Sequence, residues 1–166
     1  MSDLLVSADG FCRLGERSYR CALGFGGIVT DKHEGDGGTP VGTWPLRRLL
    51  YRPDRGEAPA CALPVEALQP DDGWCDDPRH ADYNCPVTLP FSASHEAMWR
   101  DDHLYDFVVV VGHNDAPPVA GAGSAIFLHL ARQDWGPTAG CVAFTREDFL
   151  EILGAITPDS QLVVEG

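Results

Sequence analysis

The chain alternates short apolar runs with clusters of glycine and proline, a pattern that favours strands over a bundle of helices. Tyr105–Val111 is rich in β-branched residues and is predicted to be a central buried strand. Ser124–Leu130 is expected to be the next strand, and Trp44–Arg52 and Gln161–Glu165 two more. We therefore predict a mainly β fold with a few short helices and long loops.

Two short helices are expected beside these strands. Ser94 is predicted to cap a helix that ends at Trp99. The segment Pro53–Pro90 has little periodicity and many prolines, so we expect long loops with a few short strands there. Thr145 is predicted to cap a second helix that continues to about residue 156, with four apolar residues on one face: Phe149, Ile152, Leu153 and Ile156.

The first part of the chain is predicted to be a hairpin, in which Leu4–Leu14 returns as Ser18–Leu23. If Arg13 pairs with Arg20, then Cys12 and Cys21 also face each other. A disulfide between them is then geometrically conceivable, although nothing in the sequence requires it.

Length and charge narrow the class of protein. The 166 residues suffice for one sizeable core, so residues 1–166 are predicted to form a single domain. The net charge of −13 argues against nucleic acid as a partner, because phosphate binding requires clustered Lys and Arg. No run of about 20 apolar residues predicts a membrane span. No Cys or His spacing typical of a metal site occurs.

Cys141 and His129 are the strongest candidates for chemistry. His129 lies between Leu128 and Leu130, and because strand side chains alternate, its imidazole points away from these apolar neighbours. Cys141 follows a short turn and leads into an apolar strand. A thiol needs a nearby base or positive field to act as a nucleophile near neutral pH. A histidine on an adjacent strand would supply that base.

A structural role is the competing interpretation of Cys141, since free cysteine often packs as a small hydrophobe. The preceding turn favours catalysis instead, because the backbone N–H groups at Gly140 and Cys141 are candidates for an oxyanion hole. Thr138 and Trp135 flank this turn and either hold a peptide or stiffen the loop. His113 follows the buried strand and either lines the same cleft or is a turn residue.

These residues resemble the signature of the L,D-transpeptidase catalytic domain family, also called YkuD-like, which acts on bacterial peptidoglycan. That signature is a strand histidine, a loop and Ser/Thr-x-Gly-Cys, which here are His129 and Thr138–Cys141. Lys32–Trp44 is similar to another family segment, with its Gly-Asp and Thr-Pro pairs. Further stretches resemble a proteobacterial branch of the family: Asp72–Asp77, Tyr83-Asn84, Ser94–Glu96 and His103–Asp106.

The resemblance implies a β-sandwich-like catalytic domain with a defined chemistry. Cys141 would attack a carbonyl of a peptidoglycan stem peptide with His129 as base, and an amine of a second stem would resolve the thioester into a cross-link. No cofactor is implied. Carbapenem β-lactams are expected to acylate Cys141. Seven residues are candidates for substrate binding: Thr138, Ala139, His113, Asn114, Trp74, Asp76 and Tyr83.

The resemblance also predicts a periplasmic protein, although the start of the chain lacks the basic segment and apolar core of a secretory signal. Two positions depart from the family pattern. Ala139 stands where many members have a basic or polar residue, and Ala143 stands where many have an arginine. Any task of that arginine must fall to another group here.

Three alternatives stay open. Attack by water would make the protein an L,D-carboxypeptidase. A papain-like cysteine peptidase fits less well, because that class places its histidine far downstream of the cysteine. A non-catalytic peptidoglycan-binding module, with Cys141 buried and inert, is compatible with the departures at Ala139 and Ala143.

Overall fold

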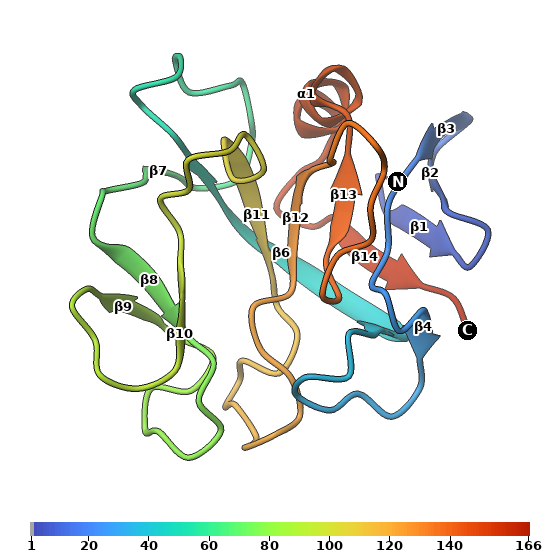
Figure 1. Ribbon diagram of the computed structural model, residues 1–166. Helices are drawn as coiled ribbons and strands as arrows, with labels where there is room; N and C mark the ends of the chain where they lie inside the picture. Colours follow the sequence, from blue (N-terminus) through green and yellow to red (C-terminus); the bar gives the residue numbers. More distant parts are fainter. Residues whose placement is uncertain (1) are drawn as a thin grey trace.

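The computed structural model describes residues 2–166, and Met1 lies outside the described residues. Strands dominate this part of the chain, as predicted (Figure 1). The strands are β1 (Leu4–Ser7), β2 (Phe11–Leu14), β3 (Arg17–Arg20), β4 (Ile28–Val29), β5 (Thr39–Pro40), β6 (Gly42–Tyr51), β7 (Val65–Ala67), β8 (Asp72–Cys75), β9 (Pro86–Thr88), β10 (His95–Ala97), β11 (Phe107–Val111), β12 (Phe127–Leu130), β13 (Val142–Phe144) and β14 (Gln161–Val164). The helix α1 spans Arg146–Ala155.

A nine-stranded sheet forms the body of the domain, in the order β13-β12-β11-β6-β14-β1-β2-β3, with β7 paired to β6. Directly after β3, Ala22 forms an antiparallel bridge with Ala143 of β13. The N–H of Ala22 donates to the carbonyl of Ala143 at 2.8 Å, and the reverse bond is 3.0 Å. Because the two ends of the strand order meet there, the sheet nearly closes on itself, consistent with a β-sandwich-like fold.

One face of this sheet packs against α1. Val142 and Phe144 of β13 belong to the same buried cluster as Phe149, Ile152 and Leu153 of the helix. The Thr145 hydroxyl accepts a hydrogen bond from the N–H of Asp148, which confirms the predicted cap. The helix thus packs against the strand that follows Cys141, and Figure 1 shows α1 next to the end of β13.

The other face carries a second buried cluster under the small sheet β10-β8-β9. Residues alternate between the two clusters along β11, where Phe107, Val109 and Val111 face the helix side and Val108 and Val110 face the small sheet. Every residue of β11 is buried, as expected for a central strand with two covered faces. In Figure 1 the small sheet and β1–β3 lie on opposite sides of β6.

Two sequence predictions are wrong. The segment Ser94–Trp99 is not a helix, because His95–Ala97 forms β10 and pairs with Gly73–Cys75 of β8. The register of the first hairpin also differs, since Cys12 pairs with Tyr19 and not with Cys21. A turn at residues 8–10 divides the first predicted strand into β1 and β2. The pairing of β2 with β3 is set by the two-residue turn Gly15-Glu16, which places Leu14 opposite Arg17.

The cysteines of this hairpin are both free and buried. Burial raises the pKa of the Cys12 thiol, so this side chain packs as a neutral, apolar group. The other predicted strands are confirmed, with β12 starting at Phe127 and not at Ser124. Ala125, which precedes β12, has a positive φ of 54°, a backbone conformation that interrupts a strand.

Candidate active site

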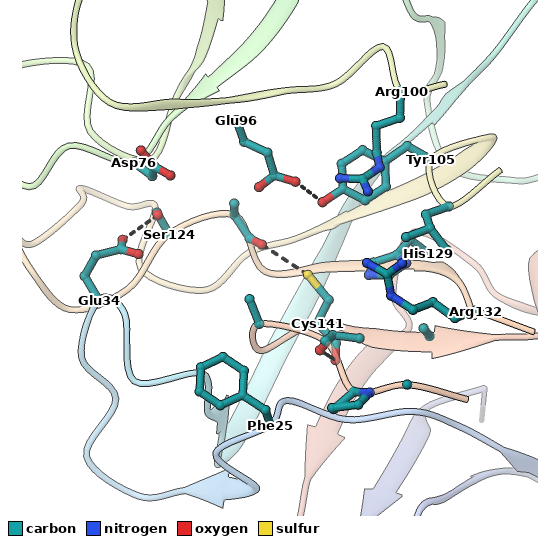
Figure 2. A pocket seen from close by; sticks show the side chains of 17 residues that line it. Phe25, Glu34, Asp76, Glu96, Arg100, Tyr105, Ser124, His129, Arg132 and Cys141 are labelled. Carbon is teal, nitrogen blue, oxygen red and sulfur yellow. Dashed lines mark hydrogen bonds between the residues drawn. The ribbon is translucent and has the colours of Figure 1, made fainter. Parts of the chain in front are cut away.

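A cavity of about 450 Å³ opens beside the ends of β12 and β13 (Figure 2). Seventeen residues line it. His129 and Cys141 are both among them. The sequence predicted that these residues lie on or beside adjacent strands, but not that they share a cavity. The titratable lining side chains are Glu34, Asp76, Glu96, Arg100, Tyr105, His129, Arg132 and Cys141.

The His129 imidazole is buried on β12, on the opposite side of the strand from Leu128 and Leu130. Its Nδ1 lies 2.9 Å from the carbonyl oxygen of Leu130. A carbonyl can only accept a hydrogen bond, so Nδ1 carries the proton and Nε2 has a free lone pair. The group that orients the second nitrogen is therefore a backbone carbonyl, which the sequence could not identify.

Burial lowers the pKa of His129 to about 4, and the nearby positive charges of Arg100 and Arg132 act in the same direction. The hydrogen bond to Leu130 acts against this shift. The ring is consequently neutral near pH 7, which is the form that accepts a proton.

The Cys141 thiol lies at the rim of the cluster beneath the small sheet. It donates a hydrogen bond to the carbonyl of Ala125 at 3.3 Å and accepts one from the N–H of Phe127 at 3.4 Å. Burial, together with the negative charge of Glu96, raises the pKa of the thiol to about 12. The resting site is thus a neutral thiol beside a neutral imidazole.

The turn before Cys141 is organised by the Thr138 hydroxyl. This group donates to the carbonyl of Cys141 at 2.7 Å and accepts from the N–H of Gly140 at 3.0 Å. The Gly140 N–H is therefore occupied in this structure, and the Cys141 N–H, which has no acceptor among the described residues, stays the oxyanion-hole prediction.

Gly140 is required at its position for steric reasons. Its φ is 136°, a value that L side chains rarely adopt, and a Cβ there would lie 2.8 Å from the carbonyl oxygen of Gly38. Gly38 belongs to the segment Lys32–Trp44 that resembles the family. This segment packs against the Cys141 turn and limits the positions that the turn can take.

An ion pair fixes the segment around Gly38. The Asp36 carboxylate accepts hydrogen bonds from Lys32 Nζ and from the N–H groups of His33 and Gly38. Burial acts to raise the pKa of Asp36, but these hydrogen bonds outweigh it and lower the pKa to about 2. Thr39 links the same segment to Gly24, because the Thr39 hydroxyl accepts a hydrogen bond from the N–H of Gly24.

Three of the predicted substrate-binding residues line the cavity: Thr138, Ala139 and Asp76. The Asp76 carboxylate accepts a hydrogen bond of 2.6 Å from the Ser94 hydroxyl. Ala139 is exposed at the cavity mouth. Their role in binding a substrate stays a prediction.

The other four predicted substrate-binding residues do not line the cavity: Trp74, Tyr83, His113 and Asn114. They brace the surrounding loops. The Asn84 side-chain oxygen accepts from Trp74 Nε1 at 2.9 Å and from the Ala125 N–H at 3.0 Å, and Ala125 is the residue whose carbonyl accepts the Cys141 proton. Tyr83 donates to Glu34 at 2.7 Å, and this carboxylate does line the cavity.

His113 and Asn114 belong to the loop after β11. Asn114 donates to the carbonyls of Val119 and Gly123, and so closes this loop on itself. His113 is buried against Trp44 with a ring separation of 4.7 Å, and burial lowers its pKa to about 4. The turn-residue interpretation therefore describes the position of His113.

Sequence reasoning missed several cavity residues. Glu96 of β10 accepts a hydrogen bond from the Tyr105 hydroxyl, and the Tyr105 ring lies 5.3 Å from the His129 ring. Arg100 donates two hydrogen bonds to the Asp102 carboxylate, from Nε at 2.9 Å and from Nη2 at 2.7 Å. Arg132 lies in the loop between His129 and Cys141. The resemblance to the family included Glu96 and Tyr105, but no local pattern indicated that they face the cavity.

Within residues 2–166, no group of three or more His, Cys, Asp or Glu side chains is placed to hold a metal ion. Among the same residues, no helix has the length and apolar character needed to cross a membrane.

Comparison with known proteins identifies the family of this domain. A β-sandwich-like fold with Cys141 and His129 in one cavity defines a candidate cysteine acyltransferase. The chain matches the YkuD family, described as the L,D-transpeptidase catalytic domain, over residues 11–164, and it belongs to that family. Membership supports an L,D-transpeptidase type of function in peptidoglycan.

A search of curated proteins gave no match. One similar solved structure is that of the helical cell shape determining protein Pgp2 from Campylobacter jejuni. The identity is 14%, the TM-score is 0.47, and the match covers 98% of this chain and 46% of that chain. The chain thus spans less than half the length of that protein.

Proposed function

We propose that this protein is a peptidoglycan L,D-transpeptidase with Cys141 as the nucleophile and His129 as the base. One observation carries the proposal: both side chains line the same cavity, and the Leu130 carbonyl holds His129 with Nε2 free to accept a proton. Family membership supplies the substrate class, the stem peptides of peptidoglycan.

In the first step, the Cys141 sulfur attacks a stem-peptide carbonyl while His129 Nε2 takes the thiol proton. The new C–S bond forms, the C–N bond of the peptide breaks, and His129 returns the proton to the leaving amine. Because burial disfavours a resting thiolate, the proposed mechanism has proton transfer accompany attack and not precede it. The hydrogen bond from the thiol to Ala125 must break for this transfer.

In the second step, a neutral amine of another stem peptide attacks the thioester. The new C–N bond forms and the C–S bond breaks, while His129 takes a proton from the amine and passes it to the sulfur, so the thiol of Cys141 is restored. A diamino acid side chain is the proposed acceptor. Water as the acceptor would give a shortened stem and L,D-carboxypeptidase activity.

Two further properties belong to this proposal. Carbapenem β-lactams would acylate Cys141, because they offer a strained carbonyl to the same nucleophile. The substrate lies outside the cytoplasmic membrane, so we place the protein in the periplasm.

The test is digestion of sacculi to muropeptides after incubation with the protein, followed by mass spectrometry. Wild type and a Cys61→Ala control are expected to give cross-linked dimers, and Cys141→Ala none. Cys61 is a suitable control because it lies outside the cavity. Shortened monomers alone would identify a carboxypeptidase. Products that form equally with Cys141→Ala would refute the mechanism, and the absence of any product would favour a non-catalytic binding module.

A further inference from the structure

Most of the charged residues of the cavity are segregated. Arg100 and Arg132 lie on the same side of Cys141 as His129, whereas Glu34 and Asp76 lie on the other side, and Glu96 lies between them with its carboxylate on the Tyr105 hydroxyl (Figure 2). Apart from His129, these two arginines are the cationic side chains that line the cavity among residues 2–166. The cavity therefore has a cationic end, defined by Arg100 and Arg132.

Arg132 has no ionic partner in the described part of the chain, where its guanidinium takes part in no salt bridge or hydrogen bond. Its stem passes over the loop, since a Cβ at Gly136 would lie 3.2 Å from Arg132 Cδ. Gly136 itself lines the cavity. An unpaired guanidinium at this position is available to a ligand anion.

Two of the three guanidinium nitrogens of Arg100 donate hydrogen bonds within residues 2–166, and the third does not. Its Nε and Nη2 donate to Asp102, and its guanidinium lies 5.2 Å from the centre of the Tyr105 ring. Nη1 has no hydrogen bond among the described residues. The position two residues after Cys141 is the uncharged Ala143, so the positive charge at this end of the cavity comes from the two arginines.

The position of the leaving amine indicates which substrate group would lie near Arg100 and Arg132. His129 must return its proton to the leaving amine, so the leaving residue lies on the His129 side of the bond that breaks. In a terminal residue, the carboxyl carbon lies about 2.5 Å from the amine nitrogen. The carboxylate of a one-residue leaving group would thus fall beside the two arginines.

We propose that Arg132 and Arg100 bind the free carboxylate of the donor's leaving residue. This inference rests on the proposed function. The arginines are specificity-determining residues, because a guanidinium pairs with a carboxylate through charge-assisted hydrogen bonds.

Two donors test the proposal: a synthetic stem peptide with a free C-terminal carboxylate, and its C-terminal amide. Loss of a hydrogen bond to a charged group predicts a kcat/KM about 10- to 100-fold higher for the acid with the wild type. Arg132→Gln is expected to lower kcat/KM for the acid by about tenfold and to have a smaller effect on the amide, so that the preference for the acid is lost, while Arg132→Lys restores part of the preference. Arg79→Gln, which removes an exposed charge outside the cavity, should behave as the wild type.

Binding to a Cys141→Ala variant, measured by calorimetry, separates this inference from the proposed function. Tighter binding of the acid that disappears with Arg132→Gln supports the carboxylate site even without turnover. Equal affinity, or equal kcat/KM for both donors in a Cys141-dependent reaction, overturns the site and leaves the transpeptidase proposal intact. Absence of any Cys141-dependent product from either donor contradicts the proposed function.

Discussion

Replacement of Gly140 by alanine tests how strictly the Cys141 turn depends on its backbone. The φ of 136° at Gly140 is one that an alanine adopts only with strain, at a cost of about 1–3 kcal/mol. The added Cβ would also lie 2.8 Å from the Gly38 carbonyl oxygen, a backbone atom in a segment held by Asp36. We therefore expect Gly140→Ala to destabilise the fold by at least about 1 kcal/mol.

Gly154→Ala is the matched control. Gly154 lies in α1, and a Cβ there would have no atom within 4 Å. Alanine is favoured over glycine inside a helix by about 0.5–1 kcal/mol, so this variant should be more stable than the wild type. The same chemical change thus has opposite expected signs at the two positions.

The assay is thermal unfolding of the three proteins, combined with alkylation of Cys141 under native conditions. For a chain of this length, each kcal/mol moves Tm by about 2–4 °C. Gly140→Ala should lower Tm and change the alkylation rate, whereas Gly154→Ala should raise Tm and leave the rate unchanged. A Gly140→Ala protein with the stability and thiol reactivity of the wild type would refute the steric argument.

Three other predictions concern the same site. The pKa values of His129 and His113 are about 4 in the fold and about 6.5 when unfolded. As pH falls below about 6.5, the unfolded chain takes up these protons first, so each histidine removes up to about 3 kcal/mol of stability by pH 4. Urea unfolding between pH 7 and 4 should show this loss, and a His113→Gln variant a smaller one; a flat profile would contradict it. Glu96→Gln should keep the bond from Tyr105 but remove a negative charge, so the pH profile of Cys141 alkylation moves to lower pH; an unchanged profile would argue against the role of that charge. Thr138→Val removes two hydrogen bonds of the turn and should cost about 1–3 kcal/mol in chemical unfolding, with loss of Cys141-dependent product; full activity would mean that the turn holds without the hydroxyl.

Local signals predicted the elements that depend on neighbouring residues. The helix α1 begins at its cap because the Thr145 hydroxyl satisfies an N–H within the first turn, an interaction that spans only three residues. The strand Phe107–Val111 was likewise predictable, since β-branched side chains suit a strand that is covered on both faces. In both cases the residues that stabilise the element lie within it, so its own sequence predicts it.

Elements that depend on distant partners were not predictable. Ser94 followed by a short apolar pattern is compatible with a capped helix, but His95–Ala97 instead gains backbone hydrogen bonds from β8, about twenty residues earlier in the chain. The register of the first hairpin was predicted wrongly for a separate reason. The two-residue turn Gly15-Glu16, in which Gly15 has φ of 62°, pairs Leu14 with Arg17 and so places Cys12 opposite Tyr19.

The candidate site shows the same division. The order of His129, the turn and Cys141 is a local motif, and it placed the two side chains in one cavity. Glu96 and Arg100 reach the cavity from β10 and the segment after it, and their orientation follows from pairing with β8 and Asp102. The pattern of apolar and polar residues around Glu96 and Arg100 does not predict that orientation.

The protonation state of the pair is the property that the motif could not give. A cysteine near a histidine is compatible with a preformed thiolate, but both groups are buried here, and burial disfavours each charged form. Arg100 and Arg132 further disfavour an imidazolium, while Glu96 disfavours a thiolate. A carboxylate bound between the arginines would offset their positive charge, and this would raise the pKa of His129 at the moment when it must receive the thiol proton. In the proposed reaction, substrate binding and activation of the base would thus be coupled through the same two guanidinium groups, so a resting site of neutral groups is compatible with nucleophilic catalysis.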